Sequence, residues 1–203
     1  RWRVMARGRK VNSNGERSKQ LLLEKAVELF STHGYHETKI SDIVTAANVT
    51  QPTFYLYFKS KDKLFNDLNE DFKKNLLSIF SGKLDSLSSG KITPREFIYE
   101  SIENAFNYFD ENPNLTKIGF FDSQSASELK DQIVELYIKT LKNEQGKLIL
   151  HNEVGIDTLA HSILGSIERL TLKYILTKQQ SPQKLANDIV NIYFVEIPTG
   201  VTN

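Results

Sequence analysis

The sequence contains no cysteine, and it has only one methionine and one tryptophan among its 203 residues. The absence of cysteine excludes disulfide bonds, thiolate metal sites and cysteine nucleophiles. No apolar run approaches the roughly 20 residues that a membrane-spanning helix needs, and the first residues are basic and polar rather than an apolar leader. We therefore expect a cytoplasmic protein without a membrane partner.

The composition is that of a globular protein, with 39% hydrophobic, 25% charged and 10% aromatic residues. The formal net charge is only +1, but it is unevenly distributed. Residues 1–65 contain twelve Lys and Arg against six Asp and Glu, whereas residues 66–203 contain fourteen against nineteen. This asymmetry indicates a nucleic acid or another anionic surface as the partner of the N-terminal part. A native start at Met5, with residues 1–4 left from expression, would reduce the excess there from +6 to +4.

Apolar residues recur at three- and four-residue spacing through most of the chain, and no stretch alternates as β-strands do. We predict an all-α fold. Before the first helix, residues 1–15 form a flexible basic arm that either enters a DNA minor groove or stays solvated. In the N-terminal part, helices are expected from Ser18 to Gly34, after an N-cap at Thr38, over 51–58, and from a cap at Ser60 to Ser81. A turn-like spacer at 84–92 follows. Further helices are expected from Thr93 to about Asn112 and over 115–122, 126–146, 156–178 and 182–196, before a frayed tail at 197–203.

Residues 39–58 have the layout of a helix-turn-helix motif: a short amphipathic helix, the turn Asn48-Val49-Thr50, and a second short helix. In such a motif the second helix lies in a DNA major groove while the first crosses the backbone. Phe54 and Phe58 are four residues apart and are expected to turn inward. The outer face of the second helix then presents Thr50, Gln51, Thr53, Tyr55 and Tyr57.

These exposed side chains carry groups that suit DNA. Gln51 can form paired hydrogen bonds with an adenine edge, and Thr53 can contact a thymine methyl or a phosphate, while tyrosine hydroxyls suit phosphate oxygens. Lys61 begins the next helix, where its charge and the free backbone N–H groups together favour a phosphate. Leu56 also points outward, and it either touches a thymine methyl or packs against Lys59.

Five short patterns follow one another in this region: A-x-E-L-F ending at Phe30, G-Y-x-x-T from Gly34, I-x-x-A-A from Ile43, V-x-x-x-T-x-Y-x-Y-F from Val49, and S-K-x-x-L from Ser60. With them, residues 17–77 resemble the DNA-binding domain of TetR-type transcriptional regulators. One departure is Asn48, which stands where glycine is usual but tolerates left-handed geometry.

The resemblance implies an N-terminal three-helix helix-turn-helix domain over 16–76, followed by a larger helical effector-binding and dimerisation domain over 77–203. It makes Gln51, Pro52 and Thr53 the base-reading residues. It also implies that Tyr55, Tyr57 and Lys61 contact the DNA backbone and that Ser41 is a contact from the preceding helix.

Aromatic residues gather on the helices expected in the C-terminal part. Ligand pockets are mostly apolar with a few polar groups, so these residues are candidates for lining one, although ordinary core positions would have the same pattern. The candidates are Tyr99, Phe106, Phe109, Phe120, Phe121 and Tyr137.

Segments 156–178 and 182–196 resemble the helix pair that forms a four-helix bundle across the two-fold axis of TetR-type dimers. Gly165, in the middle of the first segment, would allow two helices to approach closely. A homodimer is also what a helix-turn-helix protein needs to bind a palindromic operator. His161, Glu168 and Arg169 are expected to be interface or surface residues rather than ligand contacts.

The sequence gives no support for catalysis. It has no G-x-S-x-G elbow and no phosphate-binding loop, and His33 and His36 lack further metal ligands nearby. We therefore expect no enzyme activity, no metal and no cofactor. The predicted function is a ligand-responsive transcriptional repressor that binds a palindromic operator as a homodimer and is released by a small, largely apolar effector. The alternative is a small-molecule sensor or carrier of the same architecture that does not bind DNA specifically.

Overall fold

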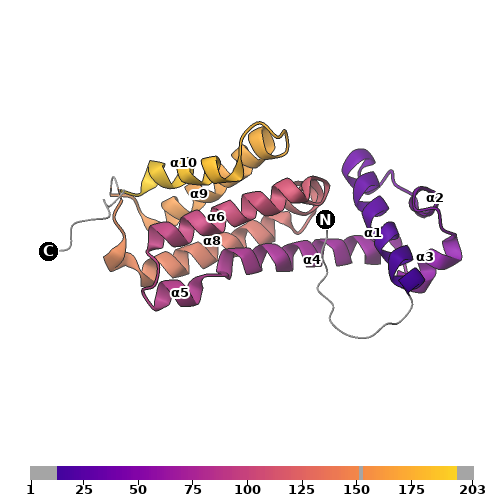
Figure 1. Cartoon of the computed structure of the whole chain (residues 1–203), viewed down its shortest axis with the longest axis horizontal. Coiled ribbons are helices and arrows are strands. Elements are labelled where there is room, and N and C mark those ends of the chain that lie inside the picture. Colours follow the sequence, from indigo (N-terminus) through magenta and orange to yellow (C-terminus); the bar gives the residue numbers. More distant parts are fainter. Residues whose placement is uncertain (1–12, 151–152, 196–203) are drawn as a thin grey trace. The chain divides into compact units, whose positions relative to one another are not determined.

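The computed structural model describes residues 13–150 and 153–195, and within these ranges its regular structure is helical apart from one isolated antiparallel bridge between Leu150 and Phe194 (Figure 1). The predicted all-α fold is confirmed. None of the described helices has both the length and the apolar character needed to cross a membrane. Residues 1–12 of the predicted arm and the predicted tail at 197–203 lie outside the described residues.

The described chain divides into two compact units, 13–73 with Pro113–Ala126 and Lys74–Asn112 with 127–195. The first unit is discontinuous in sequence, because a segment of the C-terminal half packs with the N-terminal helices. Its elements are α1 (Ser13–His33), α2 (Ile40–Ala46), α3 (Gln51–Tyr57), the first part of α4 (Lys61–Ser81), α7 (Pro113–Thr116) and the π-helical turn η1 (Lys117–Asp122).

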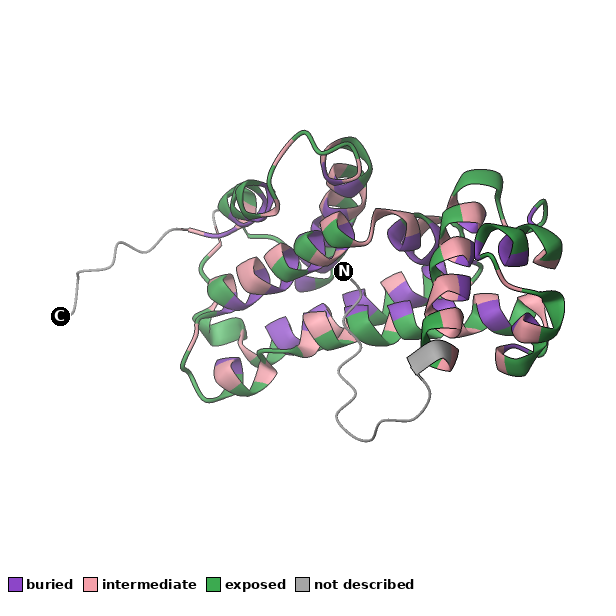
Figure 2. Cartoon of the chain, turned by 45° about the vertical axis from the view of Figure 1, so that its right-hand side comes forward, coloured by how far each residue is buried: buried purple, intermediate pink, exposed green. Residues whose placement is uncertain are grey.

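Helix α1 is the centre of the first unit, since it contacts α2, α3, α7 and η1. Burial follows one face of each helix (Figure 2), as expected for amphipathic helices that share a core. The buried side chains include Leu22, Ala26, Phe30, Ile43, Phe54, Phe58, Leu64, Leu68 and Phe72.

Gly119 in η1 marks a close approach to α4. A Cβ atom at this position would lie 2.6 Å from Cγ of the Phe72 ring, which is closer than real side chains come. The absence of a side chain at Gly119 therefore allows the segment around η1 to pack directly against α4.

The second unit is built mainly from long helices, and α10 packs along α6 and against α9. Its helices begin at residues that suit the first turn: Thr93 caps α6 reciprocally with Glu96, and Ser181 caps α10. The elements are the end of α4, α5 (Leu84–Ser88), α6 (Pro94–Glu111), α8 (Ala126–Asn143), the 3₁₀ turn η2 (Gln145–Lys147), α9 (Ile156–Leu170), the π-helical turn η3 (Thr171–Ile175) and α10 (Pro182–Tyr193).

The start of α1 and the N-cap of α2 differ from the prediction. Helix α1 begins at Ser13, five residues before the expected start, with Glu16 in a first turn that favours acidic residues. Thr38 does not cap α2, because its hydroxyl donates to the carbonyl of Gly34 and is buried there. The N-cap is Lys39, whose backbone N–H donates to Asp42 Oδ2 at 2.9 Å.

The expected spacer at 84–92 and the expected helix at 115–122 also differ. The first contains helix α5, which forms because Leu87 is buried and α5 packs against α6. The second begins earlier, at Pro113, and changes to π-helical turns from Lys117. A proline fits the first turn of a helix because its missing N–H would have no partner there.

Candidate nucleic-acid interface

The turn between α2 and α3 is built by local hydrogen bonds. Asn48 has a φ of +52°, which places it in the left-handed region. Its N–H donates to the carbonyl of Thr45, and the N–H of Val49 donates to the carbonyl of Val44. This double pattern is the Schellman ending of a helix, so the asparagine ends α2 where a glycine commonly would.

Helix α3 starts immediately after this turn. The Thr50 hydroxyl accepts a hydrogen bond from the N–H of Thr53 at 3.4 Å and lies 2.9 Å from the Thr53 hydroxyl. Pro52 in the first turn has no N–H that would need a partner. The sequence Asn48-Val49-Thr50 therefore stops one helix and starts the next within three residues, and the predicted helix-turn-helix geometry is present.

The burial of one face of α3 determines which of its side chains are exposed. Phe54 and Phe58 are buried with their ring centroids 5.6 Å apart, and α3 contacts α1 and α2. Tyr55 and Leu56 are 55% and 78% exposed. The predicted DNA contacts divide accordingly: Thr50, Gln51, Pro52 and Tyr55 are exposed on α3 or its cap, Thr53 and Tyr57 are half-buried, and Ser41 is exposed on α2.

Lys61, at the first position of α4, has partners within the protein. Its ammonium donates hydrogen bonds to the carbonyls of Tyr35 and Thr38, at 2.8 and 2.9 Å, and lies 4.2 Å from the centroid of the Tyr35 ring. These contacts hold the connection between α1 and α2 against the start of α4. The ammonium has three N–H donors, so one donor is left for another acceptor.

Tyr35 joins this anchor to an aromatic cluster. Its ring centroid is 4.5 Å from that of Phe65 and 5.7 Å from that of Phe30, and its hydroxyl donates to Asp62. Burial, followed by the hydrogen bond and the negative charge of Asp62, raises the pKa of Tyr35 to about 12. The phenol is therefore a neutral donor at ordinary pH.

The sequence reasoning did not identify Tyr35 or Asp62. Tyr35 lies within the G-Y-x-x-T pattern and Asp62 within the S-K-x-x-L pattern, and these patterns are the features of the sequence that could have pointed to them. Neither pattern shows by itself that the two segments meet.

Comparison with known proteins places this geometry in a family. The family model described as bacterial regulatory proteins, tetR family, matches residues 22–68. The chain is 35% identical over 184 residues to the HTH-type transcriptional regulator YdgC of Bacillus subtilis (strain 168), which is 90% of this chain and 93% of that protein. The chain belongs to the tetR family of bacterial regulatory proteins.

Other tetR-family proteins and related regulators match over most of their length. A fatty acid metabolism regulator protein of Bacillus subtilis (strain 168) is 28% identical over 167 residues, covering 78% of this chain and 84% of the relative. The crystal structure of a TetR-like transcriptional regulator from Rhodococcus sp. RHA1 has the same fold, with a TM-score of 0.73 at 19% identity over 91% of this chain and 96% of that one. TetR-family proteins are DNA-binding transcriptional regulators, generally ligand-responsive repressors, and this chain is therefore a transcriptional regulator.

The six aromatic residues predicted to line an effector pocket lie in both units. Phe120 and Phe121 belong to the first unit with η1, and the other four belong to the second. Phe106, Phe109, Phe120 and Tyr137 are fully buried, whereas Tyr99 and Phe121 are half-buried. Burial strongly raises the pKa of Tyr137, although its hydroxyl also bonds to Ser101 Oγ at 2.7 Å. Contact of these six residues with a ligand stays a prediction.

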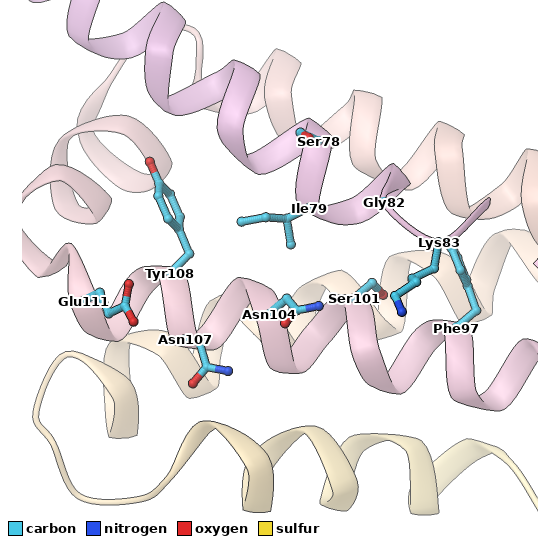
Figure 3. Close-up of a pocket in the computed structure, with 10 residues that line it drawn as sticks. All are labelled: Ser78, Ile79, Gly82, Lys83, Phe97, Ser101, Asn104, Asn107, Tyr108 and Glu111. Atoms are coloured by element: carbon cyan, nitrogen blue, oxygen red, sulfur yellow. The ribbon is translucent and has the colours of Figure 1, made fainter. Parts of the chain in front are cut away.

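A pocket of about 340 Å³ lies between the end of α4 and α6 in the second unit (Figure 3). None of the six predicted aromatics lines it. Its lining is mixed: Ser78, Lys83, Ser101, Asn104, Asn107, Tyr108 and Glu111 stand beside Ile79, Gly82 and Phe97. The sequence signal that could have found it is the row Ser101, Asn104, Tyr108 and Glu111, which repeats at three- and four-residue spacing along one helix.

Proposed function

We propose that this tetR-family regulator is a repressor that binds a palindromic operator as a homodimer and is released by a small effector. The observation that carries the proposal is the outer face of α3, where Gln51 and Tyr55 are exposed. Among the described residues neither the Gln51 amide nor the Tyr55 hydroxyl has a hydrogen-bond partner, so both remain available for DNA. In this proposal Gln51, Pro52 and Thr53 contact bases, and Ser41, Thr50, Tyr55, Tyr57 and Lys61 contact the backbone.

The proposed dimer uses α9 and α10. Leu172, which follows α9, is 45% exposed, and Ile192 on α10 is 62% exposed. Gly165 of α9 is exposed, and a Cβ atom there would meet nothing within 4 Å apart from its chain neighbours and the nearby backbone of its own helix. Exposed apolar side chains and an exposed helical glycine on this pair of helices support a face on which a second copy packs closely. A two-fold dimer would present two copies of α3 to half-sites about one helical turn, roughly 34–36 Å, apart.

The proposed effector site is the pocket between α4 and α6. Its mixed lining supports a ligand that carries hydrogen-bonding groups on an apolar frame, rather than a purely apolar one. Helix α4 supports a coupling between effector binding and DNA binding. Ser78 and Ile79 near its end line the pocket, while Lys61, a proposed DNA contact, is its first residue. A ligand can weaken DNA binding only to the extent that its affinity for the conformation that does not bind DNA exceeds its affinity for the conformation that does.

Fluorescence anisotropy with labelled duplex DNA tests the proposal. The purified chain is titrated onto DNA from upstream of its own coding sequence and onto a scrambled duplex of equal length, at several salt concentrations. A repressor is expected to bind the first duplex more tightly, with affinity that falls steeply as salt rises. Equal, weak binding to both duplexes would instead favour the sensor or carrier without specific DNA binding.

Two variants separate base contacts from backbone contacts. Gln51→Ala is expected to lose about 1–3 kcal/mol of discrimination at one base pair, and Lys61→Ala is expected to weaken binding to all sequences and lower the salt slope by about one. Gln132→Ala on α8, at a position that is also exposed, is the matched control. Identical losses on operator and scrambled DNA for Gln51→Ala would refute its role in reading bases.

A further inference from the structure

Leu56 is the most exposed large hydrophobic side chain in the described part of the chain, at 78%. It is the sixth of the seven residues of α3. The sequence is compatible with two roles for it, a contact with a thymine methyl group or packing against Lys59. A leucine covered by the apolar stem of Lys59 would lose much more of its accessible surface, so packing against Lys59 does not account for its position.

Leu56 lies on the side of α3 that is opposite to the core. Successive residues of an α-helix are about 100° apart around the axis, so Leu56 stands about 200° from Phe54, which is fully buried. Pro52, one turn earlier, is exposed on the same side. Gln51 and Tyr55 are also exposed, but they lie closer to Phe54 around the axis and form one flank of this side. An apolar residue thus occupies the middle of the outer face.

This leucine contributes little to the fold of its own chain. Burial of Phe54 and Phe58 holds α3 against α1 and α2, and a side chain that is 78% exposed adds little apolar burial to it. Leucine also has no advantage over alanine as a helix former. Single exposed leucines are common on protein surfaces, but this one is central to a surface that has a partner. Because the chain belongs to a family of DNA-binding regulators and α3 is the second helix of its helix-turn-helix motif, that partner is DNA.

The major groove offers an apolar side chain one apolar group that distinguishes the bases, the C5-methyl group of thymine. The other distinguishing groups are hydrogen-bond donors and acceptors. Against a leucine they would lose their hydration without gaining a hydrogen bond. Leu56 therefore favours thymine and disfavours a base that places a polar group at the same point.

We propose that Leu56 is a specificity-determining residue that contacts one thymine methyl group in each half-site of the operator. The inference rests on the proposed function, because it needs a chain that binds specific DNA, and it adds a fourth residue to Gln51, Pro52 and Thr53. Leu56 discriminates by apolar contact alone, whereas the Gln51 amide discriminates by hydrogen bonds. Removal of the methyl group from that thymine therefore weakens binding although every hydrogen-bonding group of the base pair is kept.

Operators that lack single methyl groups test this role by fluorescence anisotropy. The purified full chain is used to select its tightest duplex from a pool of random sequences, and the thymines of that duplex are replaced by deoxyuridine one at a time. Deoxyuridine pairs as thymine does and lacks only the methyl group. At one position in each half-site the replacement is expected to weaken binding of the parent protein about fourfold, because one methyl group is no longer buried.

The variant Leu56→Ala assigns that position to Leu56. It is expected to bind the thymine and deoxyuridine duplexes equally there, whereas Leu56→Met keeps an apolar side chain and is expected to retain the preference. Ile149→Ala, at a position that is 47% exposed and lies outside α3, is the matched control and is expected to behave as the parent. The urea unfolding midpoint of Leu56→Ala is expected to equal that of the parent, since the side chain that it removes is exposed.

Two results would overturn the inference alone. The parent protein could bind its selected duplex and show no position that is sensitive to deoxyuridine, or Leu56→Ala could keep the same sensitivity at every position. A pool from which the parent selects no sequence would refute the proposed function itself, and the role of Leu56 with it.

Discussion

The ammonium of Lys61 donates a hydrogen bond to the backbone carbonyl of Tyr35 and also lies over the ring of the same residue, 4.2 Å from its centroid. A single side chain thus holds both the backbone and the side chain of Tyr35, which lies two residues after the end of α1. The carbonyl of Thr38 is held by the same ammonium. Lys61 is therefore a structural residue of the helix-turn-helix unit, besides any contact that it makes with DNA.

Replacing Lys61 by Ala is expected to lower the free energy of unfolding by about 1–2 kcal/mol, because two hydrogen bonds from a charged donor and a ring contact are lost. Lys59→Ala is the matched control, since Lys59 is exposed and two residues away. It is expected to stay within about 0.5 kcal/mol of the parent protein. Urea unfolding followed by circular dichroism measures both, and equal stability of the two variants would contradict the anchoring role.

Alkaline pH is expected to destabilise the protein. The pKa of Tyr35 is about 12 in the folded chain and 10 for an ordinary tyrosine, so the folded state binds more protons between these values. The contribution of Tyr35 to the free energy of unfolding is therefore complete below pH 10 and is lost as the pH rises through this window. Urea midpoints across the window test the sign.

The variant Tyr35→Phe is expected to show a shallower decline across the same pH window, because its ring has no proton to lose. Part of the decline is expected to stay, since burial also raises the pKa of Tyr99 and of Tyr137. A Tyr35→Phe protein with an unchanged slope would show that Tyr35 does not contribute to the pH dependence.

Gly119→Ala is expected to destabilise the protein by about 1–3 kcal/mol, because the new methyl group meets the Phe72 ring, which is fully buried and cannot move aside. Gly146→Ala is the matched control, since a Cβ atom there meets nothing within 4 Å. Thermal unfolding of the two variants side by side is the measurement. A Gly119→Ala protein as stable as the control would mean that η1 and α4 do not pack as closely as described.

Ile192→Glu is expected to convert the proposed dimer to a monomer without unfolding it, because the side chain is 62% exposed in the single chain. A glutamate in a closely packed dimer face would lose its hydration without gaining a partner. Ile149→Glu, at a position that is 47% exposed and lies outside the proposed face, is the control. Sedimentation velocity gives the oligomeric state, and a parent protein that is already monomeric would refute the dimer.

Elements with local signals could be predicted from the sequence. Ser60 and Thr93 each accept a hydrogen bond from the N–H three residues later, as their positions before apolar stretches indicated. Phe54 and Phe58 are buried as their four-residue spacing predicts, and this fixes the exposed face of α3. The turn between α2 and α3 is likewise built by short-range hydrogen bonds.

Features decided by contacts between distant segments could not be predicted in this way. Thr38 has the side chain of an N-cap, but a backward hydrogen bond to Gly34 uses its hydroxyl. Helix α5 lies in a serine-rich stretch that has the composition of a turn, and it forms because Leu87 is buried. The aromatic side chains are a similar case, because a row of them has the same spacing whether it lines a pocket or fills a core.

The position of Pro113–Ala126 has a consequence for how this protein can be divided and recombined. Because this segment packs with the N-terminal helices, no single cut after α4 yields the complete first unit. A fragment ending near residue 76 would leave Phe72 without the surface that Gly119 brings to it. Chimeras that graft the first unit onto another regulator therefore need three crossover points, after Lys73, before Pro113 and after Ala126, so that the segment around η1 travels with the helices that it covers.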